Sequence, residues 1–168
     1  MIQGVWGIDV GVSGALVYFE PSPEGTIAEI YDMPVLQVGN KNKYTVSGTM
    51  VADILKQHDA PVWIEMVSAM PNQGVTSMFN FGRSFGVIIG CVDTLNYPSN
   101  FVTPRTWQKA MNVSGKDGSR QEAMKRLPKH FSQFTRKKDN GRSDAALIAM
   151  YGFIYGESVE NRVRQQAT

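Results

Sequence analysis

Apolar runs separated by short polar links open the chain and predict β-strands. Val5–Asp9 and Ala15–Phe19 are two such runs, joined by a glycine-rich turn at positions 11–14. Prolines and a glycine between positions 21 and 25 break the chain before a third run, Thr26–Asp32. Three consecutive strands with short links predict an antiparallel meander.

A helical period replaces the strand pattern after a polar loop at Lys41–Tyr44. From about Ser47 to His58, apolar side chains recur at the spacing of one helical face. Val62–Glu65 then predicts a short buried strand, and the longer apolar stretch Thr76–Leu95 predicts a long helix. The order is therefore strands first, followed by helices that alternate with strands.

The rest of the chain continues this alternation. Its predicted elements are a strand at Asn100–Thr103, a helix at Arg105–Met111 started by Pro104, a polar loop at 112–120, a basic helix at Gln121–Leu127 ended by Pro128, and a closing apolar helix at Asp144–Tyr155. Crossovers through helices require the later strands to run parallel to the first, which predicts an α/β fold with a mixed sheet flanked by helices. In open sheets of this kind, sites gather at the carboxyl ends of strands.

Composition favours one compact domain over residues 1–168. The chain has 168 residues with 42% hydrophobic and 19% charged side chains, and domains usually hold about 100 to 200 residues. Its single cysteine, Cys91, excludes an internal disulfide and is interpreted as a buried small side chain. We find neither the ~18 to 20 uninterrupted apolar residues of a membrane span nor the sections of a signal peptide. A soluble, cytoplasmic protein of bacterial or phage origin is therefore expected.

The net charge of +2 conceals a strongly basic segment. Residues 1–100 carry four basic and nine acidic side chains, a net charge of −5, whereas residues 101–142 carry eleven basic and three acidic ones, a net charge of +8. A concentrated positive field is typical of proteins that bind the phosphate backbone of nucleic acids, and a solvated helix face is the alternative. Charge alone therefore favours nucleic-acid contact.

Three carboxylates stand at the ends of predicted elements. Asp9 ends the first strand, Glu65 ends the fourth, and Asp144 stands at the mouth of the last helix. Each has an ordinary structural explanation: a turn, a strand end and a helix cap. Desolvation at the end of an apolar strand is costly for a carboxylate unless a cation or a basic partner offsets it. Three converging carboxylates have the hard oxygen ligands that Mg²⁺ or Mn²⁺ prefers.

Four segments resemble the RuvC-type Holliday junction resolvases of the RNase H-like superfamily, in the branch with phage and plastid relatives. They are, in family order, GIDVGVSGALV at 7–17, WIEMVSAMPNQGVTSMFNFGRSFGVIIG at 63–90, TPRTWQKAM at 103–111 and GRSDAALIAMYG at 141–152. The first segment alone also resembles sugar kinases and actin-like ATPases, whereas the second and fourth are specific. The resemblance implies an RNase H-like five-stranded sheet, with three antiparallel strands followed by two parallel ones. It also implies a homodimeric, Mg²⁺-dependent endonuclease that makes paired cuts in four-way DNA junctions and leaves 5′-phosphate and 3′-hydroxyl ends.

The same resemblance implies a set of site residues. Asp9, Glu65 and Asp144 are expected to hold two Mg²⁺ ions, or Mn²⁺ in their place, and to carry catalysis together with Lys109. The side chains implied to bind DNA are Arg105, Lys109, Lys116, Arg120 and Arg142.

This chain departs from the family pattern at two places. The family's fourth metal ligand falls on Gly141, and the nearby Asp139 is a candidate replacement, with a loop-turning role as the alternative. The aromatic residue that can wedge into the junction falls on Ser68, followed by Met70 and Pro71. Any insertion device in this chain must therefore differ.

Paired cuts with one active site per chain imply two chains. The helix at Thr76–Leu95 is the expected contact, because its apolar side chains, an outward Phe81 among them, exceed what one sheet face can bury. Gly82, Gly86 and Gly90 recur every four residues and predict a groove for close helix approach. The alternative is a monomer whose glycines pack on the sheet.

Other functional classes stay open at this point. They are a nuclease of the same fold acting on RNA–DNA hybrid or structured RNA, and an inactive junction-binding module. A kinase-like phosphotransferase is disfavoured because that fold needs a duplicated domain. His58 and His130 lack the spacing of a zinc site or a catalytic triad and are expected at the surface.

Overall fold

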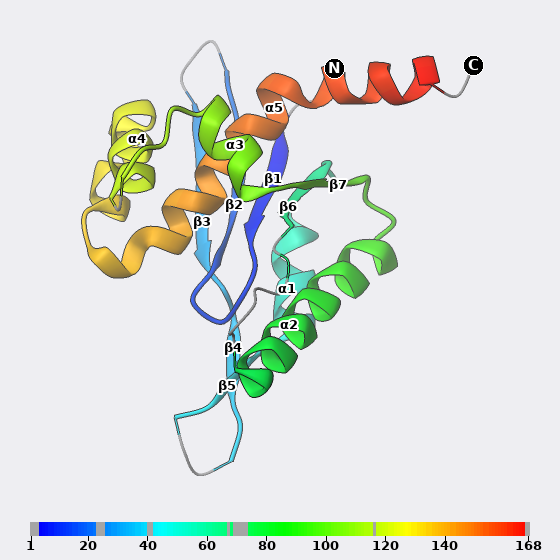
Figure 1. Cartoon of the computed structure of the whole chain (residues 1–168), viewed down its shortest axis with the longest axis vertical. Coiled ribbons are helices and arrows are strands. Elements are labelled where there is room, and N and C mark those ends of the chain that lie inside the picture. Colours follow the sequence, from blue (N-terminus) through cyan, green and yellow to red (C-terminus); the bar gives the residue numbers. More distant parts are fainter. Residues whose placement is uncertain are drawn as a thin grey trace.

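A five-stranded mixed sheet forms the centre of the molecule (Figure 1). The computed structural model describes residues 4–22, 26–39, 42–66, 68, 74–115 and 117–166, and side chains as far as residue 156. The strands are ordered β3-β2-β1-β6-β7. They are β1 (Val5–Asp9), β2 (Ala15–Glu20), β3 (Ile27–Asp32), β6 (Val62–Glu65) and β7 (Ser99–Val102). The first three are antiparallel and the last two run parallel to β1, which confirms the predicted fold class.

Helices cover both faces of this sheet. One face carries α3 (Pro104–Ala110), α4 (Gly118–Arg126), the 3₁₀ turns η1 (Pro128–Phe134) and η2 (Lys137–Asp139), and α5 (Asn140–Gln166). The other carries α1 (Gly48–Leu55) and α2 (Val75–Thr94). Successive strand residues point to opposite faces, so Val5 and Trp6 of β1 belong to two different hydrophobic cores.

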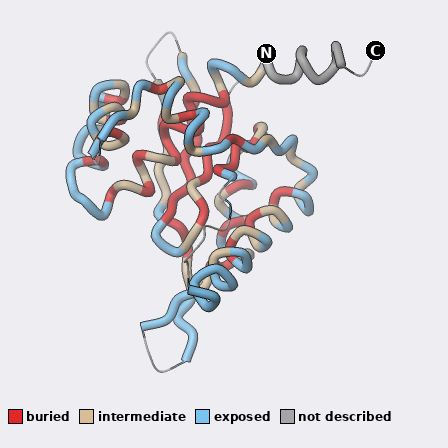
Figure 2. The backbone as a smooth tube through the Cα atoms, in the orientation of Figure 1, coloured by how far each residue is buried: buried red, intermediate tan, exposed pale blue. Residues whose placement is uncertain are grey.

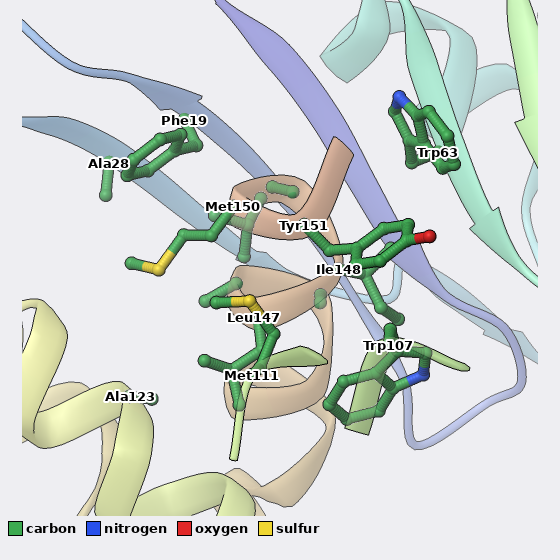
Figure 3. Close-up of a cluster of buried hydrophobic side chains, with 14 of the residues drawn as sticks. Phe19, Ala28, Trp63, Trp107, Met111, Ala123, Leu147, Ile148, Met150 and Tyr151 are labelled. Atoms are coloured by element: carbon green, nitrogen blue, oxygen red, sulfur yellow. The ribbon is translucent and has the colours of Figure 1, made fainter. Parts of the chain in front are cut away.

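The core on the α5 face is the one beside the candidate site. Figure 3 shows Trp107 of α3 gathered with Leu147, Ile148 and Tyr151 of α5, and all four are buried. This core therefore joins α3 and α5 to the sheet.

α5 approaches β1 unusually closely at Gly7. A Cβ added to Gly7 would stand 2.3 Å from the backbone oxygen of Ala145 and 2.4 Å from the backbone nitrogen of Ala149. Real Cβ atoms do not tolerate such distances, so only glycine permits this helix to lie flat on the strand. The small residues of α5, Ala145, Ala146 and Ala149, are fully buried at the same contact.

The main difference from the sequence analysis is a second, two-stranded sheet. β4 (Val35–Gln37) and β5 (Tyr44–Val46) form an antiparallel hairpin that includes part of the segment expected to be a polar loop. In Figure 1 it projects from the sheet beside the start of α2. Val46 is buried in the α1/α2-side core, and the Ser47 amide donates to the Pro34 carbonyl. The base of the hairpin is therefore anchored although its strands are short.

The closing helix also begins earlier than expected. α5 starts at Asn140, one turn before the predicted Asp144. Asp144 therefore lies inside the helix and does not cap it, which corrects its expected position. The turn before α5, η2, is closed by a capping box in which Asp139 accepts a hydrogen bond from the Arg136 amide and two more from the Arg136 guanidinium.

α2 presents an apolar surface to solvent. Val75 and Phe79 are 83% and 72% exposed, and Figure 2 shows the first turns of this helix as exposed. Nothing lies within 4 Å of a Cβ added at Gly82, Gly86 or Gly90. The glycines therefore face open space, and the alternative that they pack on the sheet is wrong.

Two further features of α2 differ from expectation. Phe81, expected to point outward, is half-buried, because it shares the inward face with Phe85, Ile88 and Val92 at helical spacing. Although polar residues interrupt its apolar run, α2 is the one helix of the described chain long and apolar enough to cross a membrane by length and composition, and little of it is buried. The low burial of α2 indicates a helix with an uncovered apolar face.

His58 and Cys91 take part in the core on the α1/α2 side. The His58 ring, expected at the surface, is half-buried and stacks on Tyr18 with ring centres 3.7 Å apart, while its Nε2 lies 2.9 Å from Glu29 Oε1. The Cys91 thiol donates to the Gly48 carbonyl, and burial raises its pKa. A raised pKa keeps the thiol protonated, which agrees with a packing role.

Candidate active site

Asp9, Glu65 and Asp144 come to one edge of the sheet. β1 and β6 are parallel neighbours, with Ile8 opposite Ile64, so their last residues, Asp9 and Glu65, end at the same edge. Asp144 precedes Ala145, which contacts β1 at Gly7. Three elements separated widely in sequence thus deliver one carboxylate each.

The three carboxylates affect one another electrostatically. Burial raises the pKa of Asp9 well above its usual range, and the nearby Asp144 and Glu65 raise it further. Burial likewise raises the pKa of Glu65, and the charge of Asp144 adds to this shift. Each ionised group therefore makes ionisation of its neighbours less favourable.

Glu65 is held by a tryptophan that the sequence analysis did not single out. Glu65 is only 8% exposed, and the Trp107 indole Nε1 donates to its Oε1 at 2.8 Å inside the core. This hydrogen bond favours the ionised carboxylate and partly opposes the effect of burial on its pKa. Trp107 is placed by α3, whose first turn is capped by the Thr103 hydroxyl and begins with Pro104.

Asp144 has an unsatisfied oxygen. Its Oδ1 is buried and has no hydrogen-bond partner among the described residues. Burial raises the pKa of Asp144, and a hydrogen bond from the Ser119 hydroxyl partly lowers it. A buried carboxylate oxygen without a partner is costly, and a bound cation would satisfy it.

The donor set therefore fits a divalent cation chemically. In the part of the chain that the structure describes, no three side chains of Asp, Glu, His or Cys are already gathered as a metal site. Asp144 and Glu65 raise the pKa of Asp9, and a positive charge between the carboxylates would relieve this repulsion. Carboxylate oxygens alone, with no soft ligand, suit Mg²⁺ or Mn²⁺.

Asp139 and Gly141 explain why the set has three acids. Both oxygens of Asp139 accept hydrogen bonds from Arg136, and this ion pair holds the pKa of Asp139 below its usual range. Its side chain is engaged in the capping box of η2, so we leave it out of the candidate ligand set. A Cβ at Gly141 would stand 2.4 Å from the Ser13 carbonyl oxygen in the β1–β2 turn. The backbone of this turn therefore leaves no room for a ligand side chain at position 141.

The basic residues implied to bind DNA divide into two groups. Arg142 makes a paired hydrogen bond to Asp32, at 2.6 and 2.7 Å, and a third to Gln133. Arg120 donates to the Thr135 carbonyl and to Asp117. These two guanidinium groups are engaged within the protein.

Arg105 and Lys109 form the second group. Both are exposed on α3, the helix that carries Trp107, and neither has an ion-pair partner among the described residues. Lys116 lies outside the described residues. The junction-wedge positions give no aromatic side chain: Ser68 is exposed, and positions 70 and 71 also lie outside the described residues.

Trp107 and Ser119 are the two site residues that sequence reasoning missed. A tryptophan in an otherwise polar helix start was a usable signal, because a buried indole N–H needs an acceptor. No comparable signal marks Ser119, which stands in the first turn of α4 and meets Asp144 only through the fold.

Comparison with known proteins identifies the fold. No family model and no curated protein matches this chain in sequence. Among 23 solved chains with a matching fold, one is described as Thermus thermophilus RuvC in complex with Holliday junction substrate; it has 14% identity and a TM-score of 0.63, and covers 93% of this chain and 96% of that chain. Another is the Thermus thermophilus RuvC structure, with 16% identity, a TM-score of 0.64 and coverage of 92% and 96%. The chain therefore has a RuvC-like fold over nearly its whole length.

Proposed function

We propose that residues 1–168 act as one RNase H-like nuclease domain that cuts four-way DNA junctions in a metal-dependent reaction. The observation that carries this proposal is the meeting of Asp9, Glu65 and Asp144, from β1, β6 and α5, at one sheet edge in a RuvC-like fold. Paired cuts on opposing strands, leaving 5′-phosphate and 3′-hydroxyl ends, are the expected products.

Asp9, Glu65 and Asp144 would hold two Mg²⁺ ions, for which Mn²⁺ would substitute. When bound, such ions polarise the scissile phosphate and lower the pKa of a bound water. Trp107 orients Glu65 and favours its ionised form, and Ser119 does the same for Asp144. The closely packed backbone of α5 on Gly7 keeps Asp144 near Asp9.

Arg105 and Lys109 would bind the DNA backbone next to the carboxylates. Both are exposed on α3, the helix whose Trp107 contacts Glu65, so phosphates held there would be within one short helix of the acids. Lys109 is the proposed contact to the scissile phosphate, and Lys116 is proposed as a further DNA contact. Arg120 and Arg142 tie neighbouring parts of the protein together through their hydrogen bonds to the Thr135 carbonyl and the Asp32 carboxylate.

A homodimer would supply the second cut. The exposed apolar face of α2, with Phe79 and the open positions Gly82, Gly86 and Gly90, supports this assembly. Close helix approach at small residues would bury the apolar face. We assign the protein to DNA recombination and repair in the cytoplasm of a bacterium, or of the host of a phage that encodes it.

The deciding experiment is incubation of purified protein and Mg²⁺ with labelled four-way junction, linear duplex and RNA–DNA hybrid. Symmetric cuts in the junction alone are expected. Cleavage of the hybrid in preference to the junction would assign the protein to the RNase H-like alternative. Tight junction binding without cleavage in either metal would identify a binding module.

Lys109→Ala is expected to flatten the salt dependence of junction binding. Loss of one phosphate contact changes the slope of log affinity against log salt by about 0.9. Lys56→Ala is the matched control, because Lys56 is exposed at the C-terminal end of α1 and pairs with Asp53. Fluorescence anisotropy between ~50 and 300 mM salt measures both slopes. Equal slopes for the two variants would remove Lys109 from the DNA contact.

Trp107→Phe is expected to slow cleavage most at acidic pH. The indole N–H lowers the pKa of Glu65, so its loss raises that pKa and moves the acidic limb of the pH–rate profile to higher pH. A hydrogen bond to a charged group contributes about 1.5–3 kcal/mol, so the rate on the acidic limb should fall about tenfold or more. Trp63→Phe, in the same core, controls for lost packing. A uniform rate loss at every pH, equal in both variants, would reduce Trp107 to a packing role.

A further inference from the structure

A groove of about 540 Å³ lies between the β4–β5 hairpin and the first half of α2. Lys43 and Tyr44 of the hairpin and Asn80 and Arg83 of α2 line its walls. Gly11 and Val12 line its inner end, and they follow Asp9 by two and three residues. The groove therefore leads to the turn that begins at the candidate active site.

The two walls of this groove are tied together. Arg83 Nη2 donates to the Thr45 hydroxyl at 2.7 Å, which links α2 to β5. The neighbouring Val46 is buried in the core on the α1/α2 side. The groove is thus a built feature of the fold, although the sequence pattern predicted only a polar loop there.

The groove concentrates positive charge in an otherwise acidic part of the chain. Two of the four basic residues in positions 1–100, Lys43 and Arg83, line it, and no acidic residue occurs between positions 33 and 52. Neither Lys43 nor Arg83 has a carboxylate partner among the described residues, and Lys41 lies outside them. A groove lined by cations without carboxylate partners is suited to bind a polyanion.

Tyr44 adds an aromatic surface to these cations. Its side chain is 50% exposed and lines the groove. Proteins hold unpaired nucleic-acid strands by two features: cations that contact the phosphates, and aromatic rings on which bases stack. This groove has both. The groove lies on the α1/α2 face of the sheet, whereas Arg105 and Lys109 lie on the α5 face.

We propose that this groove binds an unpaired stretch of the DNA strand next to the cleavage point. One base stacks on Tyr44, and the flanking phosphates contact Lys43 and Arg83. The strand then crosses the sheet edge at Asp9 to reach α3, so both faces of the sheet contact the substrate. The identity of the strand as junction DNA rests on the proposed function; the groove as a nucleic-acid site does not.

The test measures binding of fluorescent four-way junction and of a single-stranded oligonucleotide in EDTA, where no strand is cut. Tyr44→Ala is expected to weaken binding about 5- to 150-fold, the equivalent of one lost stacking contact of about 1–3 kcal/mol. Tyr44→Phe keeps the ring and should bind like wild type. Lys43→Ala and Arg83→Ala should each flatten the salt slope by about 0.7 to 0.9. Lys56→Ala should leave it unchanged.

Thr45→Val separates the charge of Arg83 from its structural contact. It removes the Arg83 hydrogen bond but keeps the guanidinium, so the salt slope should stay at the wild-type value. An oligonucleotide carrying a photoreactive uracil should crosslink to Tyr44 in wild-type protein, which tests the site even if Tyr44→Ala fails to fold.

The outcomes distinguish this inference from the proposed function. If Tyr44→Ala, Lys43→Ala and Arg83→Ala bind DNA with wild-type affinity and salt slope and still cut the junction, the groove is not a DNA site. The proposed nuclease function would be unaffected. Weakened binding in these variants of a protein that cuts no substrate would support the groove and overturn the nuclease. A third outcome would show that the groove residues only support the fold. In that case Thr45→Val would change binding as much as Arg83→Ala does, Lys43→Ala would have no effect, and Tyr44 would form no crosslink.

Discussion

Asp9→Asn, Glu65→Gln and Asp144→Asn are each expected to reduce junction cleavage at least about a thousandfold while junction binding stays nearly intact. Each change removes one oxygen charge from the proposed metal site, and metal-ion stabilisation of the transition state contributes several kcal/mol, or tenfold in rate for every 1.36 kcal/mol. Single-turnover cleavage and gel-shift binding measure the two effects. Asp53→Asn, an exposed acid on α1, is the control. Full cleavage by any of the three variants would remove that residue from the catalytic set.

Thermal melting gives a second readout of the same acids. Their pKa values are raised in the folded protein, so the stability they contribute is present at low pH and is lost as pH rises through those values. At neutral pH in EDTA, Asp9→Asn should therefore melt above wild type. Mg²⁺ at about a hundredfold excess over its Kd should stabilise wild type by about 2.7 kcal/mol and the variant far less. An equal Mg²⁺ response in both proteins would contradict metal binding by Asp9.

Phe79→Arg is expected to convert a dimer into a monomer and paired cuts into slow, unpaired nicks. Phe79 is 72% exposed on α2, and an arginine buried there in a helix–helix contact without a partner would cost several kcal/mol. This position replaces Phe81, which the structure places against the core. Sedimentation at micromolar concentration measures assembly, and a supercoiled plasmid that extrudes a junction reports nicks against linear product.

Gly86→Leu isolates the helix contact from protein folding. A Cβ at Gly86 meets nothing within 4 Å, so the substitution fits the monomer and should stabilise the helix by about 0.5–1 kcal/mol. It nevertheless blocks close approach of a second helix. Met50→Arg on α1, another exposed apolar position, should change neither property. A wild-type protein that sediments as a monomer with and without junction would contradict the dimer.

The strands and helices of the sheet were predictable because their residues are patterned locally. Val5–Asp9 and Val62–Glu65 read as strands from the sequence and are strands in the structure. The β4–β5 hairpin was not predictable, since each strand has only three residues and the anchoring contact of Val46 comes from the helices. The early start of α5 was missed because Gly141 reads as a turn, whereas the Ser13 backbone requires glycine there.

Side-chain partners at the site were less accessible to sequence reasoning. Trp107 meets Glu65 across 42 positions, and Arg142 meets Asp32 across 110. No local spacing reports such contacts. Counting charges also overstated the surface available to DNA in residues 101–142, because Arg120, Arg136 and Arg142 are paired with acids of the protein itself. In the acidic first hundred residues, the same counting concealed the positive groove at Lys43 and Arg83.

Because α5 contacts β1 through its backbone at Gly7, a mutation can lower the stability of the protein without changing the spacing between Asp9 and Asp144. Backbone atoms of Ala145 and Ala149, and not large side chains, set how far α5 stands from β1. A change such as Leu147→Ala should lower the free energy of unfolding by about 2–5 kcal/mol and leave the spacing of the Asp9 and Asp144 backbones unaltered. Core side chains can therefore be substituted over evolutionary time without moving the acids, whereas position 7 must remain glycine. Such a division of constraint is compatible with a RuvC-like fold retained at 14% to 16% sequence identity.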